Sequence, residues 1–103
     1  MSIYPPVEVW NGRVISLMQA LLGTISPNYR MVSILYENDV WILRFVLEVQ
    51  DEVDLDEIND TGAEFEAFEG SDFDYQIRVE VFSGLLMMPS YPERVVYRRR
   101  EVD

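Results

Sequence analysis

The apolar residues of this chain recur at two different spacings, which restricts the fold to a mixture of helices and strands. Between residues 12 and 25 they recur every three or four positions, as on one face of a helix. Residues 30–37 and 40–50 have the composition and alternation of strands, and residues 37–39 have the length and chemistry of a hairpin turn. The first half of the chain therefore predicts a helix followed by a β-hairpin.

The helix spacing returns in the second half of the chain. Residues 51–69 predict a second helix, with Asp51 as its N-cap and Gly70 at its end. Gly62 lies inside this helix, where glycine costs about 1 kcal/mol relative to alanine. It therefore indicates either a close approach of the helix to the sheet or a break in the helix.

The last part of the chain predicts two more strands and, with them, the fold class. Residues 73–82 alternate regularly between apolar and polar side chains, residues 94–102 also alternate, and an irregular connection over residues 83–92 joins them. The predicted order is α-β-β-α-β-β. It indicates an α+β fold in two layers, with a four-stranded, mainly antiparallel sheet and two helices on one face.

The size of the chain fits one domain. Its 103 residues, 49% of them hydrophobic, suffice for a single packed core and not for two. We expect a single domain over residues 1–103. Residues 1–11 are predicted to be an extended N-terminal lead-in, because Pro5 and Pro6 disfavour a helix, with Trp10 packed against the body.

The charge composition excludes several classes of function. The formal net charge is -11 and the pI is near 4.2, so direct binding to nucleic acid or to an anionic membrane is disfavoured. No apolar run approaches the length of a membrane span, and the N-terminus lacks the basic start and cleavage site of a signal peptide. The chain has no cysteine. These features predict a cytoplasmic protein.

Every charged residue from Glu48 to Asp74 is acidic. On the predicted second helix these carboxylates stand three and four positions apart, where like charges destabilise a helix by about 0.2–0.5 kcal/mol per pair. One interpretation is a solvated face that keeps the protein soluble. The other is a docking surface for a basic partner protein, which would speed association and add specificity. On this second interpretation the acidic part of the site comprises Asp54, Asp56, Glu57, Asp60, Glu64, Asp72 and Asp74.

A binding surface also needs apolar or aromatic anchors, which supply most of the binding energy. Tyr75 is a candidate as an exposed aromatic residue, and Leu86, Met87 and Met88 are candidates in the irregular connection. Flexible methionines suit an adaptable contact with a partner or with a second copy of the chain in a homodimer. The alternative is that this segment folds back and covers the core.

The last strand carries three consecutive arginines at residues 98–100. In a chain this acidic we expect them to pair across the sheet with Asp74, Glu80 or Glu48. A basic patch for nucleic acid is the other interpretation.

No pattern for catalysis, a metal or a cofactor is present in the sequence. Asp51, Asp54 and Asp56 superficially resemble a calcium loop, but the glycine required at its sixth position is missing and the segment is predicted to be helical. The serines have no histidine, cysteine or lysine to activate them, and there is no glycine-rich phosphate loop. We expect no catalytic residue, no metal, no cofactor and no enzymatic activity.

Four stretches of the sequence, together with the acidic helix, resemble a known class of proteins. They are residues 17–23 (LMQALLG), 25–30 (ISPNYR), 45–48 (FVLE) and 94–100 (RVVYRRR). In its general sequence character the chain resembles small acidic bacterial immunity proteins that accompany contact-dependent growth-inhibition toxins. The resemblance implies a cytoplasmic protein that neutralises a cognate toxin domain, often a basic nuclease, by tight binding. It leaves open whether such binding covers the active site or a neighbouring surface.

A second hypothesis belongs to another class of function. A small self-associating structural or adaptor domain would use the face or the edge of the sheet and would have no catalytic activity.

Overall fold

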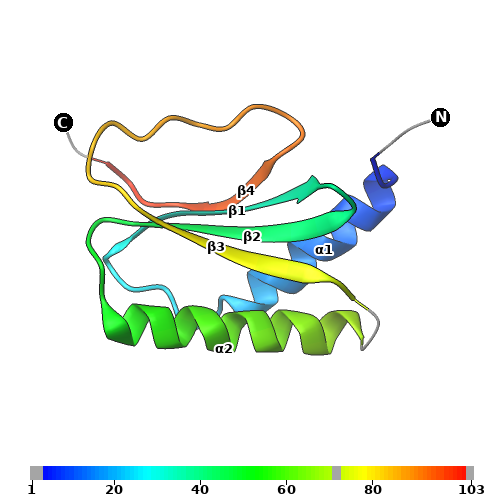
Figure 1. The fold of residues 1–103 in the computed structure, drawn as a ribbon, viewed down its shortest axis with the longest axis horizontal. Helices are drawn as coiled ribbons and strands as arrows, with labels where there is room; N and C mark the ends of the chain where they lie inside the picture. The colour runs from blue at the N-terminus through cyan, green and yellow to red at the C-terminus, as the bar shows by residue number, and fades with distance from the viewer. Residues whose placement is uncertain (1–3, 71–72, 102–103) are drawn as a thin grey trace.

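The computed structural model describes residues 4–70 and 73–101. Its elements follow the predicted order, and the fold is α+β as predicted (Figure 1). The elements are α1 (Val7–Ala20), β1 (Tyr29–Glu37), β2 (Val40–Leu47), α2 (Glu52–Glu69), β3 (Tyr75–Val81) and β4 (Arg94–Arg98).

The four strands form one mixed sheet in the order β3-β2-β1-β4. β1 pairs antiparallel with both β2 and β4, whereas β3 pairs parallel with β2. The prediction of a mainly antiparallel sheet was therefore wrong, because the sheet is mixed and β3 runs parallel to β2. The reason is that β2, α2 and β3 form a crossover unit, in which α2 carries the chain back to the end where β2 begins.

The main core lies between one face of the sheet and the helices. Ile34 on β1 and Leu43 and Phe45 on β2 are fully buried on this face. Leu17 from α1 and Phe65 from α2 belong to the same cluster of buried side chains. Figure 1 shows α1 and α2 on one side of the sheet, crossing at an angle to each other.

α1 begins earlier than predicted. The expected extended lead-in over residues 1–11 is wrong from Val7 onward, while residues 1–3 lie outside the described residues. Pro6 is the N-cap of α1, with φ -62° and ψ 158°. A proline is tolerated at the start of a helix, where the N–H that it lacks would have no partner. As predicted, Trp10 is buried, with its ring centroid 4.8 Å from that of Trp41.

α2 is continuous, so Gly62 marks a close approach and not a break. A Cβ atom at this position would lie 2.6 Å from Cδ1 of Ile77 and 3.3 Å from the ring of Tyr75, both on β3. Asp51 caps the helix as predicted, since its side chain accepts backbone hydrogen bonds of 2.9 and 3.1 Å from the first turn.

Several elements end earlier than predicted. β2 stops at Leu47 and not at residue 50, because Asn28 binds the backbone of Val49, accepting from its N–H at 2.9 Å and donating to its carbonyl at 2.7 Å. α1 stops at Ala20, and β3 and β4 are shorter than the predicted strands.

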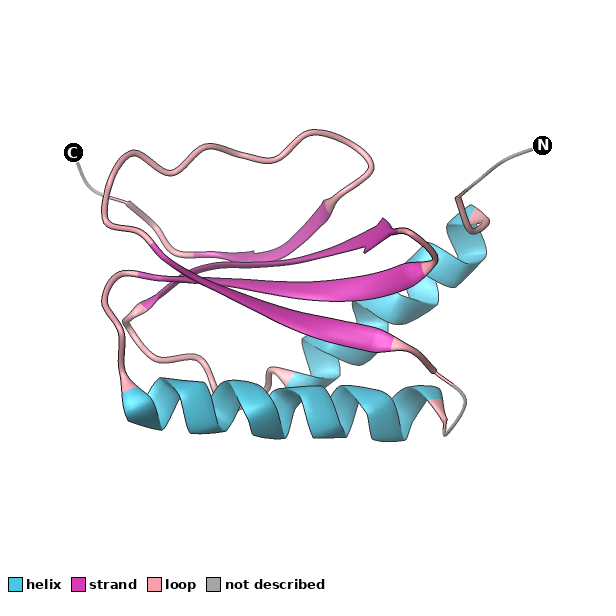
Figure 2. Ribbon diagram, viewed as in Figure 1, coloured by secondary structure: helices cyan, strands magenta, loops and turns pink. Residues whose placement is uncertain are grey.

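Residues 82–93, which we call the crossing loop, connect β3 to β4 across the face of the sheet opposite the helices (Figure 2). The crossing follows from the strand order, because β3 and β4 lie at opposite edges of the sheet. Leu86 is 8% exposed and packs with Met31 and Val46 in a second, smaller core. The two helices therefore cover one face of the sheet, and the crossing loop covers the other.

An arginine on β2 connects the crossing loop to the sheet. Arg44 donates two hydrogen bonds of 2.9 Å to Glu80 on β3 and one of 3.0 Å to Glu93 at the end of the loop. Ser33, which is fully buried, also donates to Glu93. The hydrogen bonds from Arg44 lower the pKa of Glu80. This cluster fixes the far end of the loop against the sheet.

A second arginine cluster connects β1 with the end of the described chain. Arg30, which is 3% exposed, donates to Glu101 at 2.7 Å, and Arg99 donates to the same carboxylate at 2.9 Å. Arg99 also donates to Glu48 at 2.7 Å. Arg99, which lies just after β4, thus makes the predicted ion pair with Glu48.

The two glycines inside helices should respond differently to the same substitution. Gly62→Val should destabilise the protein by about 1–3 kcal/mol, because the new side chain would overlap Ile77. At Gly12 in α1 an added Cβ would meet no atom within 4 Å, so Gly12→Val should change stability by less than about 0.5 kcal/mol. Urea unfolding measures both values. Equal losses at the two positions would contradict the close approach of α2 to β3.

Glu101 should make the stability depend on pH. Hydrogen bonds from Arg30 and then from Arg99 lower the pKa of Glu101 to about 2. A carboxyl group whose pKa is lowered by folding stabilises the protein above its unfolded pKa of about 4.3, and this contribution disappears as the pH falls toward the native value. The unfolding free energy lost in Glu101→Gln should therefore be largest near neutral pH and should shrink below about pH 4.3.

Urea unfolding of both proteins at neutral and at acidic pH measures this change. Glu8→Gln is the control, because Glu8 is exposed and has no arginine partner within the described residues. It should alter stability little at either pH. A loss in Glu101→Gln that is the same at both pH values would contradict the proposed role of the Glu101 carboxylate.

Candidate partner-binding surface

Four neighbouring carboxylates, which we call the acidic row, occupy the outer side of α2: Asp56, Glu57, Asp60 and Glu64. Asp56, Asp60 and Glu64 are exposed, and Glu57 is half-buried. They gather as predicted, because residues three and four positions apart share a helix face. Within residues 4–70 and 73–101, none of them has an arginine at ion-pairing distance.

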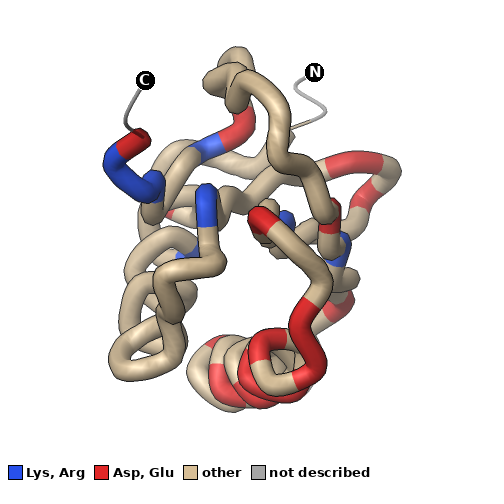
Figure 3. The backbone as a smooth tube through the Cα atoms, turned by 90° about the vertical axis from the view of Figure 1, so that its left-hand side faces the viewer, with Lys and Arg blue, Asp and Glu red and all other residues tan. Residues whose placement is uncertain are grey.

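The positive charges lie elsewhere on the protein. Figure 3 shows α2 nearly end-on, with its acidic positions in red and no basic position along it. The ion pairs of the arginines are made with carboxylates around the sheet and at the end of α2, namely Glu37, Glu48, Glu69, Glu80, Glu93 and Glu101. The arginines therefore leave the acidic row negative.

Asp54 does not belong to the acidic row. It is 5% exposed, and its Oδ2 accepts a hydrogen bond of 2.9 Å from the amide of Asn28. Asp54 is therefore not on the exposed acidic face on which the sequence analysis placed it. Its position, four residues before the buried Ile58, turns it inward. There it joins the first turn of α2 to the segment that precedes β1.

The predicted site continues beyond α2 with Asp72, Asp74 and Tyr75. Asp72 lies outside the described residues, and Asp74 is exposed just before β3. Tyr75 is half-buried on the core face of β3, with its ring centroid 6.0 Å from that of Phe65. Burial, followed by the charge of Glu66, raises the pKa of Tyr75. Tyr75 is therefore not the exposed aromatic side chain that the sequence analysis expected.

The crossing loop lies on the other side of the sheet from the acidic row (Figure 2). Leu86 is buried there, so the interpretation as core cover fits this residue. Met87 and Met88 are 71% and 51% exposed. A partner that covers the acidic row would have to reach around the sheet to contact these two methionines.

A groove between α1 and α2 opens directly beside the acidic row. The residues that line it are Ala20, Leu22, Thr24, Glu57, Asp60, Thr61 and Glu64. Leu22, on its α1 side, is 78% exposed. Sequence reasoning missed this groove because it assigned the apolar residues of the first helix to the core. The available signal was that residues 14–29 contain no charged residue, although they include exposed positions.

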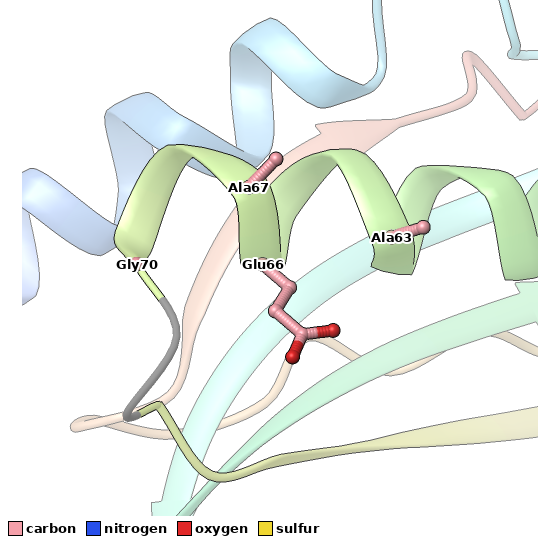
Figure 4. A pocket seen from close by; sticks show the side chains of 4 residues that line it. All are labelled: Ala63, Glu66, Ala67 and Gly70. Carbon is pink, nitrogen blue, oxygen red and sulfur yellow. The ribbon is translucent and has the colours of Figure 1, made fainter.

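A second hollow lies near the C-terminal end of α2 and is lined by Ala63, Glu66, Ala67 and Gly70. Figure 4 shows the side chain of Glu66 pointing away from Ala67 and toward the sheet, where the hydroxyl of Tyr75 donates to it at 3.5 Å. The charged residue of this hollow is therefore engaged within the protein, and we assign the hollow no binding role.

The ionisable groups near the groove favour a role in binding a partner over a role in catalysis. Tyr29 is fully buried, and its hydroxyl has no hydrogen-bond partner among the described residues. Burial, followed by the charges of Asp54 and Glu57, raises the pKa of Tyr29 to about 12, so this phenol stays neutral. Across the described ranges, no three acidic side chains converge in a way that could hold a metal ion. What this surface presents is negative charge next to apolar area.

Comparisons with known proteins complete the description of the chain. Within the described residues, no helix combines the length and the apolar character needed to cross a membrane. No curated protein matches the sequence. The family model of the MafI2 immunity protein matches residues 12–101, a range that contains the whole sheet, all of α2 and most of α1. The chain therefore belongs to the MafI2 immunity protein family, in agreement with its predicted resemblance to bacterial immunity proteins.

Proposed function

We propose that this protein neutralises a cognate toxin domain by binding it on the α2 side of the fold, without catalysing a reaction. The match to an immunity protein family supports the neutralising role. The acidic row supports the location, because its carboxylates have no arginine partner in the described part of the chain. A positively charged partner would supply the missing counter-charges.

The toxin domain that fits this surface best is a nuclease that acts in the cytoplasm. A nuclease has to attract the phosphate backbone of its substrate, so positive charge surrounds its active site. The acidic row presents the opposite charge along a helix of 18 residues that packs firmly against the sheet. This arrangement favours fast association with a cationic surface and rejects acidic proteins.

Co-expression tests the neutralising role. The partner to use is the cognate toxin domain, to be sought as the basic C-terminal domain of a large secreted protein encoded by a neighbouring gene. Cells that make the toxin domain alone should stop growing, and cells that make both proteins should grow. If the toxin is a nuclease, RNA or DNA extracted from the arrested cells should be degraded. RNA or DNA extracted from the protected cells should be intact. Arrest that persists in the presence of this protein would rule out the proposed function.

The acidic row should control how fast the complex forms. Asp60→Asn combined with Glu64→Gln removes two of its charges while keeping the size of the side chains. The association rate constant with the toxin domain should fall by about three- to tenfold at low ionic strength and should depend less on salt. Stopped-flow mixing over a series of salt concentrations measures both effects.

Glu8→Gln combined with Asp39→Asn is the matched control. Both residues are exposed and have no arginine partner within the described residues, and the net charge changes by the same amount. This variant should associate within about twofold of the unmodified protein. Equal effects of the two variants would show that total charge, and not the acidic row, drives the attraction.

A further inference from the structure

α1 is apolar on two of its faces. Leu17 and Leu21 lie on the face that is buried in the main core. On another face, three residues that we call the apolar patch, Ile15, Met18 and Leu22, are 56%, 51% and 78% exposed. Ile15 and Met18 are neighbours on α1, three positions apart, and Leu22 lies in the turn that follows the C-cap Leu21. Large apolar side chains that are exposed together, beside polar residues, are typical of a surface that a partner covers.

Leu22 connects the apolar patch to the acidic row. It lines the groove together with Glu57, Asp60 and Glu64, so apolar area and unneutralised carboxylates are direct neighbours. Because residues 14–29 carry no charge, all the charge of this surface stands on its α2 side. The complementary surface is an apolar contact region flanked on one side by lysine or arginine side chains.

We propose that the apolar patch anchors the complex with the cationic toxin domain, with Leu22 at the centre of the contact and the acidic row beside it. This inference rests on the proposed neutralising function and gives that function a defined surface. The acidic row speeds the encounter, whereas the apolar patch sets the lifetime of the complex, because buried apolar anchors supply most of the binding energy.

The crossing loop suits a cationic partner less well. It also exposes apolar side chains, Leu85 at 79% and Met87 at 71%. However, Leu85 borders a hollow that Arg98 also lines. Arg98 is exposed and has no ion-pair partner in the described part of the chain. A cationic domain on this side would therefore meet positive charge.

A second copy of the chain is also a poor occupant of the apolar patch. Contact between two apolar patches would bring two acidic rows close together. With a net charge of -11 on each chain, this contact would be repulsive. Charge complementarity thus favours the toxin domain over self-association.

The test compares two double variants with the same chemistry. Met18→Gln/Leu22→Gln changes the apolar patch, and Leu85→Gln/Met87→Gln changes the crossing loop. All four side chains are more than half exposed, so circular dichroism and thermal melting should show intact folding for both variants. Interferometry with the toxin domain encoded beside this gene then measures binding.

The apolar-patch variant should raise the Kd by at least about tenfold, mainly through faster dissociation, and the crossing-loop variant should stay within about twofold. Tight binding by the apolar-patch variant, or an equal loss in the crossing-loop variant, would overturn this inference alone. Failure of the unmodified protein to bind the toxin domain would instead overturn the proposed function, and the inference with it.

Sedimentation of the protein alone, over about a hundredfold range of concentration, tests whether a second copy of the chain covers the apolar patch. We expect a monomer throughout. A dimer that disappears in Met18→Gln/Leu22→Gln would assign the apolar patch to a second copy of the chain and would overturn the inference.

Discussion

The parallel pairing of β2 with β3 is the constraint on which the rest of the structure depends. Two neighbouring parallel strands need a connection that returns along the sheet, and α2 is that connection. Gly62 lets α2 pass close to β3. The same pairing leaves β3 and β4 at opposite edges, so the crossing loop has to span the far face. Helices therefore cover one side of the sheet and an irregular segment covers the other.

This arrangement also separates the charges. The crossing loop brings Glu93 to Arg44, and the end of the chain brings Glu101 to Arg30, so arginines neutralise carboxylates around the sheet. The outer side of α2 has no such partners among the described residues, and it borders the exposed apolar side of α1. In our account these two neighbouring features share the work of binding: charge attracts the toxin domain, and apolar contact retains it.

Spacing along the sequence was enough to predict the order of the elements and the cap at Asp51, and it left a close approach and a helix break as the two interpretations of Gly62. It could not predict the direction of β3, because a strand alternates in the same way in parallel and antiparallel pairs. Asp54 was misassigned because its charge was weighed above its position on the buried side of α2. The exposed apolar side of α1 was missed because periodicity identifies a helix and does not show which of two apolar faces meets the core.

The central claim is that the toxin domain binds the α1–α2 side of the protein. Oxidative footprinting of the methionines tests it most directly, because Met18 and Met88 are both 51% exposed and lie on opposite sides of the sheet. Oxidation of a methionine depends on its access to solvent. Binding of the toxin domain should protect Met18 from oxidation and leave Met88 as reactive as in the free protein. Protection of Met88 with Met18 unchanged would contradict the central claim.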